Sequence, residues 1–201
     1  MIDIVIPAGN EAEFAEIGKR LGYSGLFFLY RLDNYHSASY AGADKDIKAY
    51  KGIIAEAGDA VKIKTRLKGE KAFVVIKSNG EDREIIKDRK ANLIFSFEDS
   101  SRKDFVHHRA SGLNHILCKL AKESGIIVGF SLSALFNSRN KSVAIGRLMQ
   151  NISLCHKFKV NTAIASFATA PFEMRSPHDL QSLFKVFGHK NPEFLKEPSV
   201  F

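Results

Sequence analysis

Residues 125–167 read GIIVGFSLSALFNSRNKSVAIGRLMQNISLCHKFKVNTAIASF, and this stretch decides the fold class. It begins with a short apolar run, IIVGFS (126–131), that has the length and composition of a buried strand. Apolar residues at helical spacing follow over 141–158, and a second apolar run, NTAIASF (161–167), comes next. The order of strand, helix and strand predicts a parallel unit in which the helix crosses over between neighbouring strands.

The same alternation continues on the N-terminal and C-terminal sides of that unit. The patterns predict strands at 2–6, 25–30, 61–67, 72–77 and 91–97, and helices at 14–21, 47–57, 113–124 and 177–187, with a last short helix from Asn191. Ser176, followed by Pro177 and Asp179, is a well-formed helix start. Seven or eight strands favour a small, irregular, TIM-like β/α barrel over an open sheet. No linker or internal repeat divides the chain, so we expect a single domain over residues 1–201.

Composition and charge narrow the class of protein. Hydrophobic residues make up 45% and charged residues 26% of the chain, which excludes a disordered, collagen-like or coiled-coil protein. The net charge of +8 indicates a polyanionic partner such as nucleic acid, with a merely basic surface as the alternative. The net charge is −3 over residues 1–60, +6 over 61–134 and +5 over 135–201. A phosphate-facing surface should therefore draw mainly on the last two thirds of the chain.

The cysteines and the apolar segments indicate the compartment. Cys118 and Cys155 lie among apolar residues without a CxxC motif, so we expect two buried thiols and neither a zinc site nor a disulfide framework. The N-terminus lacks the basic region of a signal peptide, and the longest apolar stretch, roughly 125–136, is too short to span a bilayer. We expect a cytoplasmic protein with no membrane partner.

Sequence motifs give little support to catalysis by the chain itself. There is no GxGxxG, P-loop or GxSxG motif, and none of the seven histidines belongs to an HxH at a strand end, so we expect no metal site. Acid–base chemistry needs paired carboxylates in a pocket. The candidates expected at strand ends are Asp3, Glu98, Asp99 and Glu173, whereas Asp104 and Asp179 are expected at helix starts, where a structural role is favoured.

Basic residues supply the remaining candidates for a binding surface. Arg109 and Arg175 each lie where a loop meets a predicted helix N-terminus, a place that attracts anions. The alternative for both is a buried arginine–carboxylate pair. The other candidate cations, for each of which a solvated face is the alternative, are Lys87, Arg89, Lys90, Arg102, Lys103, Lys119, Lys122, Arg139, Lys141, Arg147, Lys157 and Lys159.

Six segments together resemble a known family. They are, in order, RKANLIF (89–95), HHRASGLNHILCKLAKESGI (107–126), FSLSALF (130–136), RLMQNISLCHKFKV (147–160), IASFA (164–168) and EMRSPHDLQSL (173–183). The sequence is similar to the protein component 3 family of archaeal ribonuclease P, whose eukaryal counterpart is a p30-type ribonuclease P and MRP subunit. The resemblance is good over roughly 85–190, with a looser fit over 1–84.

The resemblance implies a TIM-barrel-like fold related to the PHP phosphoesterases. It implies a protein subunit of the ribonucleoprotein that removes the 5′ leader from precursor tRNA, with the catalytic Mg²⁺ site in the RNA and no cofactor bound by the protein. It implies partnership with protein component 2, other protein subunits and the catalytic RNA. The positions that the resemblance marks for RNA or partner contact are Arg89, Arg109, His115, Lys122, Lys157, Arg175 and Asp179. Two alternatives stay open: a metal-dependent PHP-type phosphoesterase, and a scaffold that contacts only its protein partner.

Overall fold

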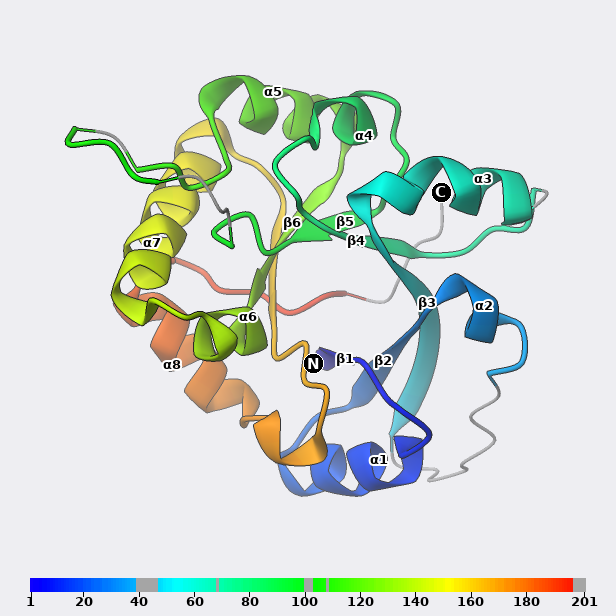
Figure 1. Ribbon diagram of the computed structural model, residues 1–201. Coiled ribbons are helices and arrows are strands. Elements are labelled where there is room, and N and C mark those ends of the chain that lie inside the picture. The colour runs from blue at the N-terminus through cyan, green and yellow to red at the C-terminus, as the bar shows by residue number, and fades with distance from the viewer. Residues whose placement is uncertain (39–46, 68, 100–102, 108, 197–201) are drawn as a thin grey trace.

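Seven parallel strands form one sheet in a computed structural model that describes residues 1–38, 47–67, 69–99, 103–107 and 109–196 (Figure 1). Each strand pairs with the next along the chain. In order, they are β1 (Ile2–Val5), β2 (Gly25–Tyr30), β3 (Lys48–Glu56), β4 (Val74–Lys77), β5 (Leu93–Phe95), β6 (Ile127–Ser131) and β7 (Thr162–Ala165). This sequential parallel order is the order of a β/α barrel, so the predicted architecture is confirmed.

Helices surround the sheet on its outer side (Figure 1). They are α1 (Glu11–Arg20), α2 (Leu32–Tyr35), α3 (Ala60–Leu67), α4 (Arg83–Lys87), α5 (His115–Ser124), α6 (Leu132–Asn137), α7 (Lys141–Phe158) and α8 (Pro177–Val186). Two 3-10 turns, η1 (Ala57–Asp59) and η2 (Pro171–Glu173), follow β3 and β7. Within the described ranges, no helix is both long enough and apolar enough to cross a membrane.

The barrel is nearly closed between β1 and β7. At one end of the gap, the Ile6 amide donates a 2.8 Å hydrogen bond to the Ala168 carbonyl oxygen. At the other end the C-terminal segment enters the gap: Leu195 forms an antiparallel bridge with Ile2, and the Ile164 amide donates to the Glu193 carbonyl oxygen. The last described residues therefore act as a partial eighth strand.

The barrel interior is a separate hydrophobic cluster in which large rings face small residues. Its large members include Phe27, Phe73, Phe95 and Phe167. A Cβ atom at Gly52 of β3 would lie 2.4 Å from the Phe27 ring and 2.8 Å from the Phe73 carbonyl oxygen. Seven strands enclose little volume. Rings as large as these therefore fit inside the barrel only where a neighbouring strand has a glycine in place of a side chain.

A larger core lies between the barrel and its helices. It contains the outward-facing residues of the strands, such as Phe28, Ile94 and Phe130, and the buried faces of α5, α7 and α8. Cys118 of α5 and Cys155 of α7 belong to this core as free thiols, as predicted.

Three predicted elements are wrong. Residues 47–57 show apolar residues at helical spacing but form β3, because Tyr50, Gly52 and Ile54 face the interior and both edges of the strand are paired. Residues 61–67 were expected as a strand from their alternation but form α3, with Ala60 and Ile63 buried three residues apart. The segment after Asn191 is not a helix, since it extends toward the bridge at Leu195.

Candidate nucleic-acid interface

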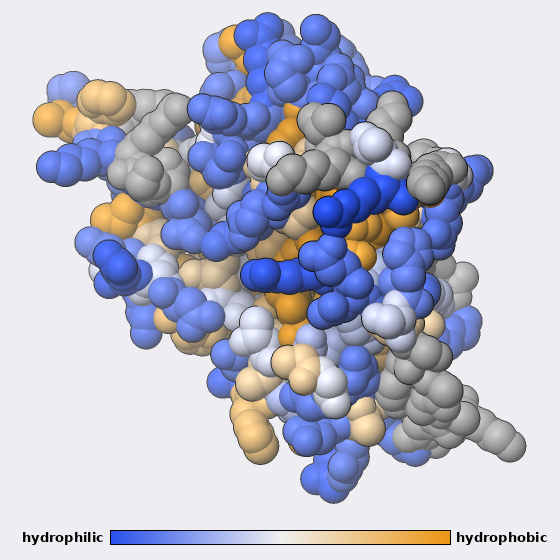
Figure 2. Space-filling view, turned by 45° about the vertical axis from the view of Figure 1, so that its right-hand side comes forward, coloured by the Kyte–Doolittle hydropathy of each residue, from blue (hydrophilic) through white to orange (hydrophobic). Residues whose placement is uncertain are grey.

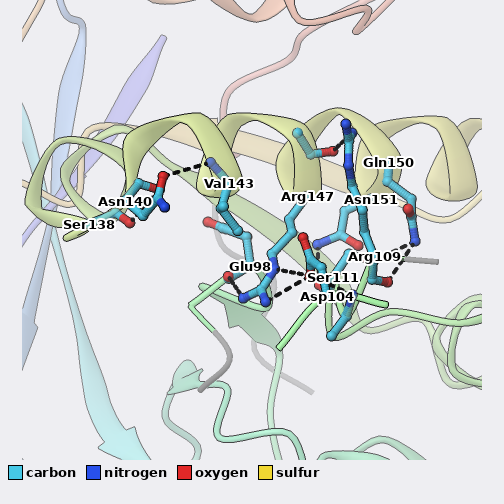
Figure 3. A network of polar contacts seen from close by, with 12 residues as sticks. Glu98, Asp104, Arg109, Ser111, Ser138, Asn140, Val143, Arg147, Gln150 and Asn151 are labelled. Carbon is cyan, nitrogen blue, oxygen red and sulfur yellow. Dashed lines mark hydrogen bonds and ion pairs between the residues drawn. The ribbon is translucent and has the colours of Figure 1, made fainter. Parts of the chain in front are cut away.

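A polar network ties the loop after β5 to helix α7 (Figure 3). Arg147 of α7 is 5% exposed and donates from Nε to Asp104 Oδ1 at 2.8 Å and from Nη1 to the Glu98 carbonyl oxygen at 3.2 Å. Asp104 also accepts from the Ala110 amide at 2.8 Å. Burial alone would raise the pKa of Asp104, but these hydrogen bonds outweigh it and hold that pKa below its usual value.

Arg109, in the loop before α5, lies against the same helix next to Arg147. Its Nη1 donates to the Gly146 carbonyl oxygen at 2.9 Å. A Cβ atom at Gly146 would lie 2.7 Å from the guanidinium, so the absence of a side chain there lets Arg109 lie flat on α7. Gln150 donates to the Ser111 hydroxyl at 2.9 Å, and Asn151 donates to the Ser111 carbonyl oxygen at 2.7 Å. The network therefore fixes the exposed Arg109 against a rigid element.

Arg109 and His115 line one groove of about 650 Å³ between this loop and helices α5 and α7. Gln150 and Leu154 form its α7 wall. The side chains at the loop tip, Phe105 and Val106, are 73% and 93% exposed. The structure thus brings together two of the predicted contact residues beside an exposed apolar tip.

Three further predicted residues lie on the same side of the barrel. Arg89 follows α4 and donates to the Glu123 carbonyl oxygen at 3.1 Å, which places its guanidinium at the C-terminal end of α5, the helix that also carries Lys122. Lys157 lies in the last turn of α7, which packs against α5. All three side chains are exposed. Arg89, Arg109, His115, Lys122 and Lys157 therefore belong to one face built from α5, α7 and their adjoining loops.

Arg175 and Asp179 lie apart from that face, at the start of α8. The Arg175 guanidinium donates to the carbonyl oxygens of Phe172 and Met174, at 2.8 and 2.7 Å. Ser176 accepts from the Asp179 amide at 3.2 Å, which confirms the predicted N-cap. The alternative of a buried arginine–carboxylate pair is wrong for Arg109 and Arg175, because both are exposed and donate to backbone carbonyls.

The ion pair with a buried arginine occurs instead at Arg147, which the sequence predicted as a candidate binding cation with a solvated face as the alternative. Its side chain is 6% exposed in the ion pair with Asp104, whereas Arg109, which contacts the adjacent Gly146 from another loop, is exposed. Asp104 was expected at a helix start and lies in a loop. No local pattern marks Arg147, because its partner is 43 residues away in the sequence.

The candidate carboxylates do not form a pair. Asp3 lies inside β1 and accepts from the Ser166 amide and hydroxyl, at 2.7 and 2.6 Å, and burial raises its pKa to about 6. Glu98 is buried, Oε1 has no partner among the described residues, and burial raises its pKa to about 7. Asp99 forms an ion pair with Lys77, and Glu173 accepts from the Thr169 amide.

The mouth of the barrel, at the carboxyl ends of the strands, holds a cavity of about 590 Å³. Its lining contains three cations that the sequence analysis did not select, Arg31, Arg66 and Lys77, and no histidine. Across the described part of the chain, no group of three or more His, Cys, Asp or Glu side chains is arranged to hold a metal ion. The mouth therefore lacks the ligand set that a metal-dependent phosphoesterase would use.

Comparisons with known proteins agree on one family. The family model of RNase P subunit p30 matches residues 1–194. Ribonuclease P protein component 3 of Methanosarcina acetivorans is 33% identical over 104 residues, which is 49% of this chain and 44% of that protein. The component 3 protein of Methanosarcina barkeri is 24% identical over 97% of this chain and 82% of that protein. The first of these alignments thus covers less than half of either protein.

Solved structures agree on the fold. A chain from the cryo-EM structure of archaeal ribonuclease P with mature tRNA aligns with a TM-score of 0.73 and 18% identity, over 92% of this chain and 82% of that one. Histidinol phosphate phosphatase from Lactococcus lactis, in complex with zinc, L-histidinol and phosphate, aligns with a TM-score of 0.57 and 11% identity over 95% of each chain. The expected likeness to a PHP-type barrel is thereby confirmed at the level of fold.

Proposed function

The chain belongs to the RNase P subunit p30 family, and we propose that it acts as a protein subunit of ribonuclease P, the ribonucleoprotein that removes the 5′ leader from precursor tRNA. The observation that carries the proposal is the match of the family model to residues 1–194, which includes every strand of the barrel. Its proposed partners are the ribonuclease P RNA, protein component 2 and the other protein subunits, and precursor tRNA is the substrate of the whole complex.

We propose that the chain itself is noncatalytic and that the Mg²⁺ of the reaction is held by the RNA. Support comes from the distribution of the candidate residues. The five on the α5–α7 face spread along the surface instead of converging on one pocket, and none of them lies at the barrel mouth. A spread of cations suits a phosphate backbone better than a reaction centre.

The geometry of that face suggests how it would bind RNA. Arg89 and Arg109 each have one guanidinium nitrogen engaged with a backbone carbonyl, which restricts the side chain while other N–H groups stay available for phosphate oxygens. Lys122 and Lys157 add mobile point charges. Phosphates neutralised in this way repel one another less, so the RNA would need less Mg²⁺ to hold its active shape.

A cytoplasmic location belongs to the same proposal. Cys118 and Cys155 are both free and buried, as suits a protein that works in a reducing compartment.

The test is a reconstitution with labelled precursor tRNA. This protein is assayed alone, and then with the cognate RNA and component 2 at limiting Mg²⁺, with and without this chain. We expect no cleavage by the protein alone and cleavage by the mixture that depends on its addition. Cleavage by the protein alone that a chelator abolishes would favour the phosphoesterase alternative. Activation of the complex without RNA affinity of the isolated chain would favour the partner-only scaffold.

A further inference from the structure

The cavity at the barrel mouth has the size and the position of a ligand site. Its volume of about 590 Å³ is within the range of small-molecule pockets. It opens at the carboxyl ends of the strands, where ligands of β/α barrels bind. The face of the molecule in Figure 2 shows a hydrophobic hollow bordered by hydrophilic side chains, which is the character of the cavity lining.

Two strained residues form part of the lining. Ser96 follows β5 and Phe167 follows β7, and their φ angles are +62° and +49°. Such a backbone conformation costs about 1 kcal/mol or more for a residue other than glycine, and it concentrates at functional sites. Phe167 stacks on Phe95 with ring centroids 4.2 Å apart, and both rings border the cavity as its apolar floor.

Ser96 is also a polar group without a partner. Its side chain is 1% exposed, and its Oγ makes no hydrogen bond with any described residue. A buried hydroxyl without a partner costs free energy, so a ligand that supplied the missing hydrogen bond would recover that cost. The strain and the unpaired hydroxyl are independent observations, and both belong to the cavity lining.

The charged groups at the rim are mixed in sign. Arg66 pairs with Asp33 at 2.6 Å, and Lys77 pairs with Asp99 at 3.4 Å. The guanidinium of Arg31, at the start of α2, has no hydrogen-bond or ion-pair partner in the described part of the chain. Two further carboxylates, Glu56 and Asp59, lie at the end of β3 and in η1. The rim thus offers one available guanidinium together with carboxylate acceptors.

We propose that this cavity binds one unpaired nucleotide of an RNA chain, with the base inside and the phosphate at Arg31. A free phosphate would meet the carboxylates unfavourably, whereas an amino group on a base donates to a carboxylate. The apolar floor takes the flat face or the edge of a base, and arginine is suited to phosphate. This inference rests on the proposed function, because ribonuclease P RNA and precursor tRNA supply the nucleotide.

Calorimetric titration tests the proposal on the intact protein with three probes: a single-stranded RNA tetramer, the mononucleotides 5′-AMP and 5′-CMP, and inorganic phosphate. We expect the tetramer to bind most tightly and phosphate to bind least. Arg31→Ala should weaken tetramer binding about tenfold, as expected for a charge-assisted contact. Ala134→Trp, which places a large side chain in the half-buried lining, should abolish it.

Two control variants keep the result specific. Arg20→Ala removes an exposed arginine from α1, and Val186→Trp adds the same large side chain at a position of α8 that is 77% exposed. Both should bind the tetramer as the unaltered chain does, and thermal melts identify any variant that fails to fold. Unchanged binding in both Arg31→Ala and Ala134→Trp, or phosphate binding as tight as tetramer binding, overturns the proposal.

The test of the nucleotide site and the test of the proposed function can fail independently of each other. A chain that activates precursor tRNA cleavage but binds the tetramer equally well with and without a blocked cavity loses only the nucleotide site. A chain that passes the cavity tests but does not activate cleavage keeps the nucleotide site and loses its place in ribonuclease P.

Discussion

Arg147 and Asp104 form an ion pair in which Nε and Nη2 of the arginine each lie 2.8 Å from the same carboxylate oxygen. The pair joins α7 to the loop after β5, and the arginine also satisfies the Glu98 carbonyl oxygen. The arginine side chain is 6% exposed and that of the aspartate 25%. The pair therefore supports the surface that carries Arg109 without itself being a free cation.

Replacing Arg147 by alanine should destabilise the protein. The change removes a buried side chain and leaves the Glu98 carbonyl oxygen without its donor, and losses of this kind are about 2 kcal/mol. Chemical denaturation measures the free energy of unfolding. Arg139→Ala is the matched control, because it removes an exposed arginine just before α7 and should change stability by less than about 0.5 kcal/mol. Equal stability of the two variants would show that the buried pair has no structural role.

Gly146→Ala should separate the stability of α7 from the placement of Arg109. Alanine favours a helix over glycine by about 1 kcal/mol, so the variant should be as stable as the unaltered chain or more so. Its Cβ atom would displace the Arg109 guanidinium, which is the movable end of a flexible side chain. We expect RNA affinity to fall about fivefold, close to the effect of Arg109→Ala.

Ser153→Ala is the control for that experiment, since it changes an exposed position of the same helix without touching Arg109. A filter-binding assay with ribonuclease P RNA gives the affinity. If Gly146→Ala binds RNA as tightly as Ser153→Ala does, Arg109 is not held in place for RNA.

Elements that local interactions determine are predictable from the sequence, whereas elements that depend on distant partners are not. Helix α7 and strands β6 and β7 were predicted well, because local periodicity and length determine them. The segments that became β3 and α3 were exchanged, because their patterns suit both periods and only pairing with β2 and β4 decides. Ser176 was predicted as a cap because capping is local.

The sites differ in the same way, because some depend on residues close in the sequence and others on distant partners. Arg109 and His115 share a groove because they lie close together in the sequence, just before and at the start of α5. Arg147 was assigned to the surface because its burial depends on a partner in another loop. Of the lining of the barrel mouth, only Asp99 was among the candidates expected at strand ends, because residues such as Arg31 and Ser96 come from separate strand ends and have no motif.

Glu98 should make stability depend on pH. Burial raises its pKa in the folded protein from 4.5 to about 7, so the folded state binds this proton more strongly than the unfolded chain does. The contribution of Glu98 to stability is therefore fully present below pH 4.5, and it is lost as pH rises from 4.5 through about 7. The shift corresponds to at most roughly 3 kcal/mol.

Glu98→Gln removes this titration. The free energy of unfolding of the variant minus that of the unaltered chain should therefore rise between pH 5 and pH 8. Urea denaturation at both values gives the difference. Asp3→Asn offers no substitute, because Asp3 accepts two hydrogen bonds from Ser166 and its loss would also break that contact. A constant difference across this range would show that Glu98 is not protonated in the fold.

Gly52→Ala should be strongly destabilising. The added methyl group would overlap the Phe27 ring and the Phe73 carbonyl oxygen, and neither can move without disturbing the packed interior. We expect a loss of about 3 kcal/mol or a failure to fold. Gly58→Ala is the control, since a Cβ atom there meets no atom within 4 Å. Thermal melting of the two variants compares them directly, and a stable Gly52→Ala variant would contradict the tight packing of the barrel interior.

The α5–α7 face should bind RNA through phosphate contacts, and the salt dependence of binding measures them. Each cation that neutralises a phosphate releases about one counterion, so log K falls with log salt by about one unit per contact. Arg89→Ala, Lys122→Ala and Lys157→Ala should each reduce that slope by about one unit and weaken binding at low salt.

The control is Arg20→Ala, which removes an exposed arginine of α1 that is paired with Glu16 and should leave the slope unchanged. Affinity for ribonuclease P RNA is measured from about 0.05 to 0.5 M salt, around the physiological value of about 0.15 M. If the three variants of the α5–α7 face all keep the slope of the unaltered chain, these side chains do not contact phosphates, and the RNA surface lies elsewhere on the barrel.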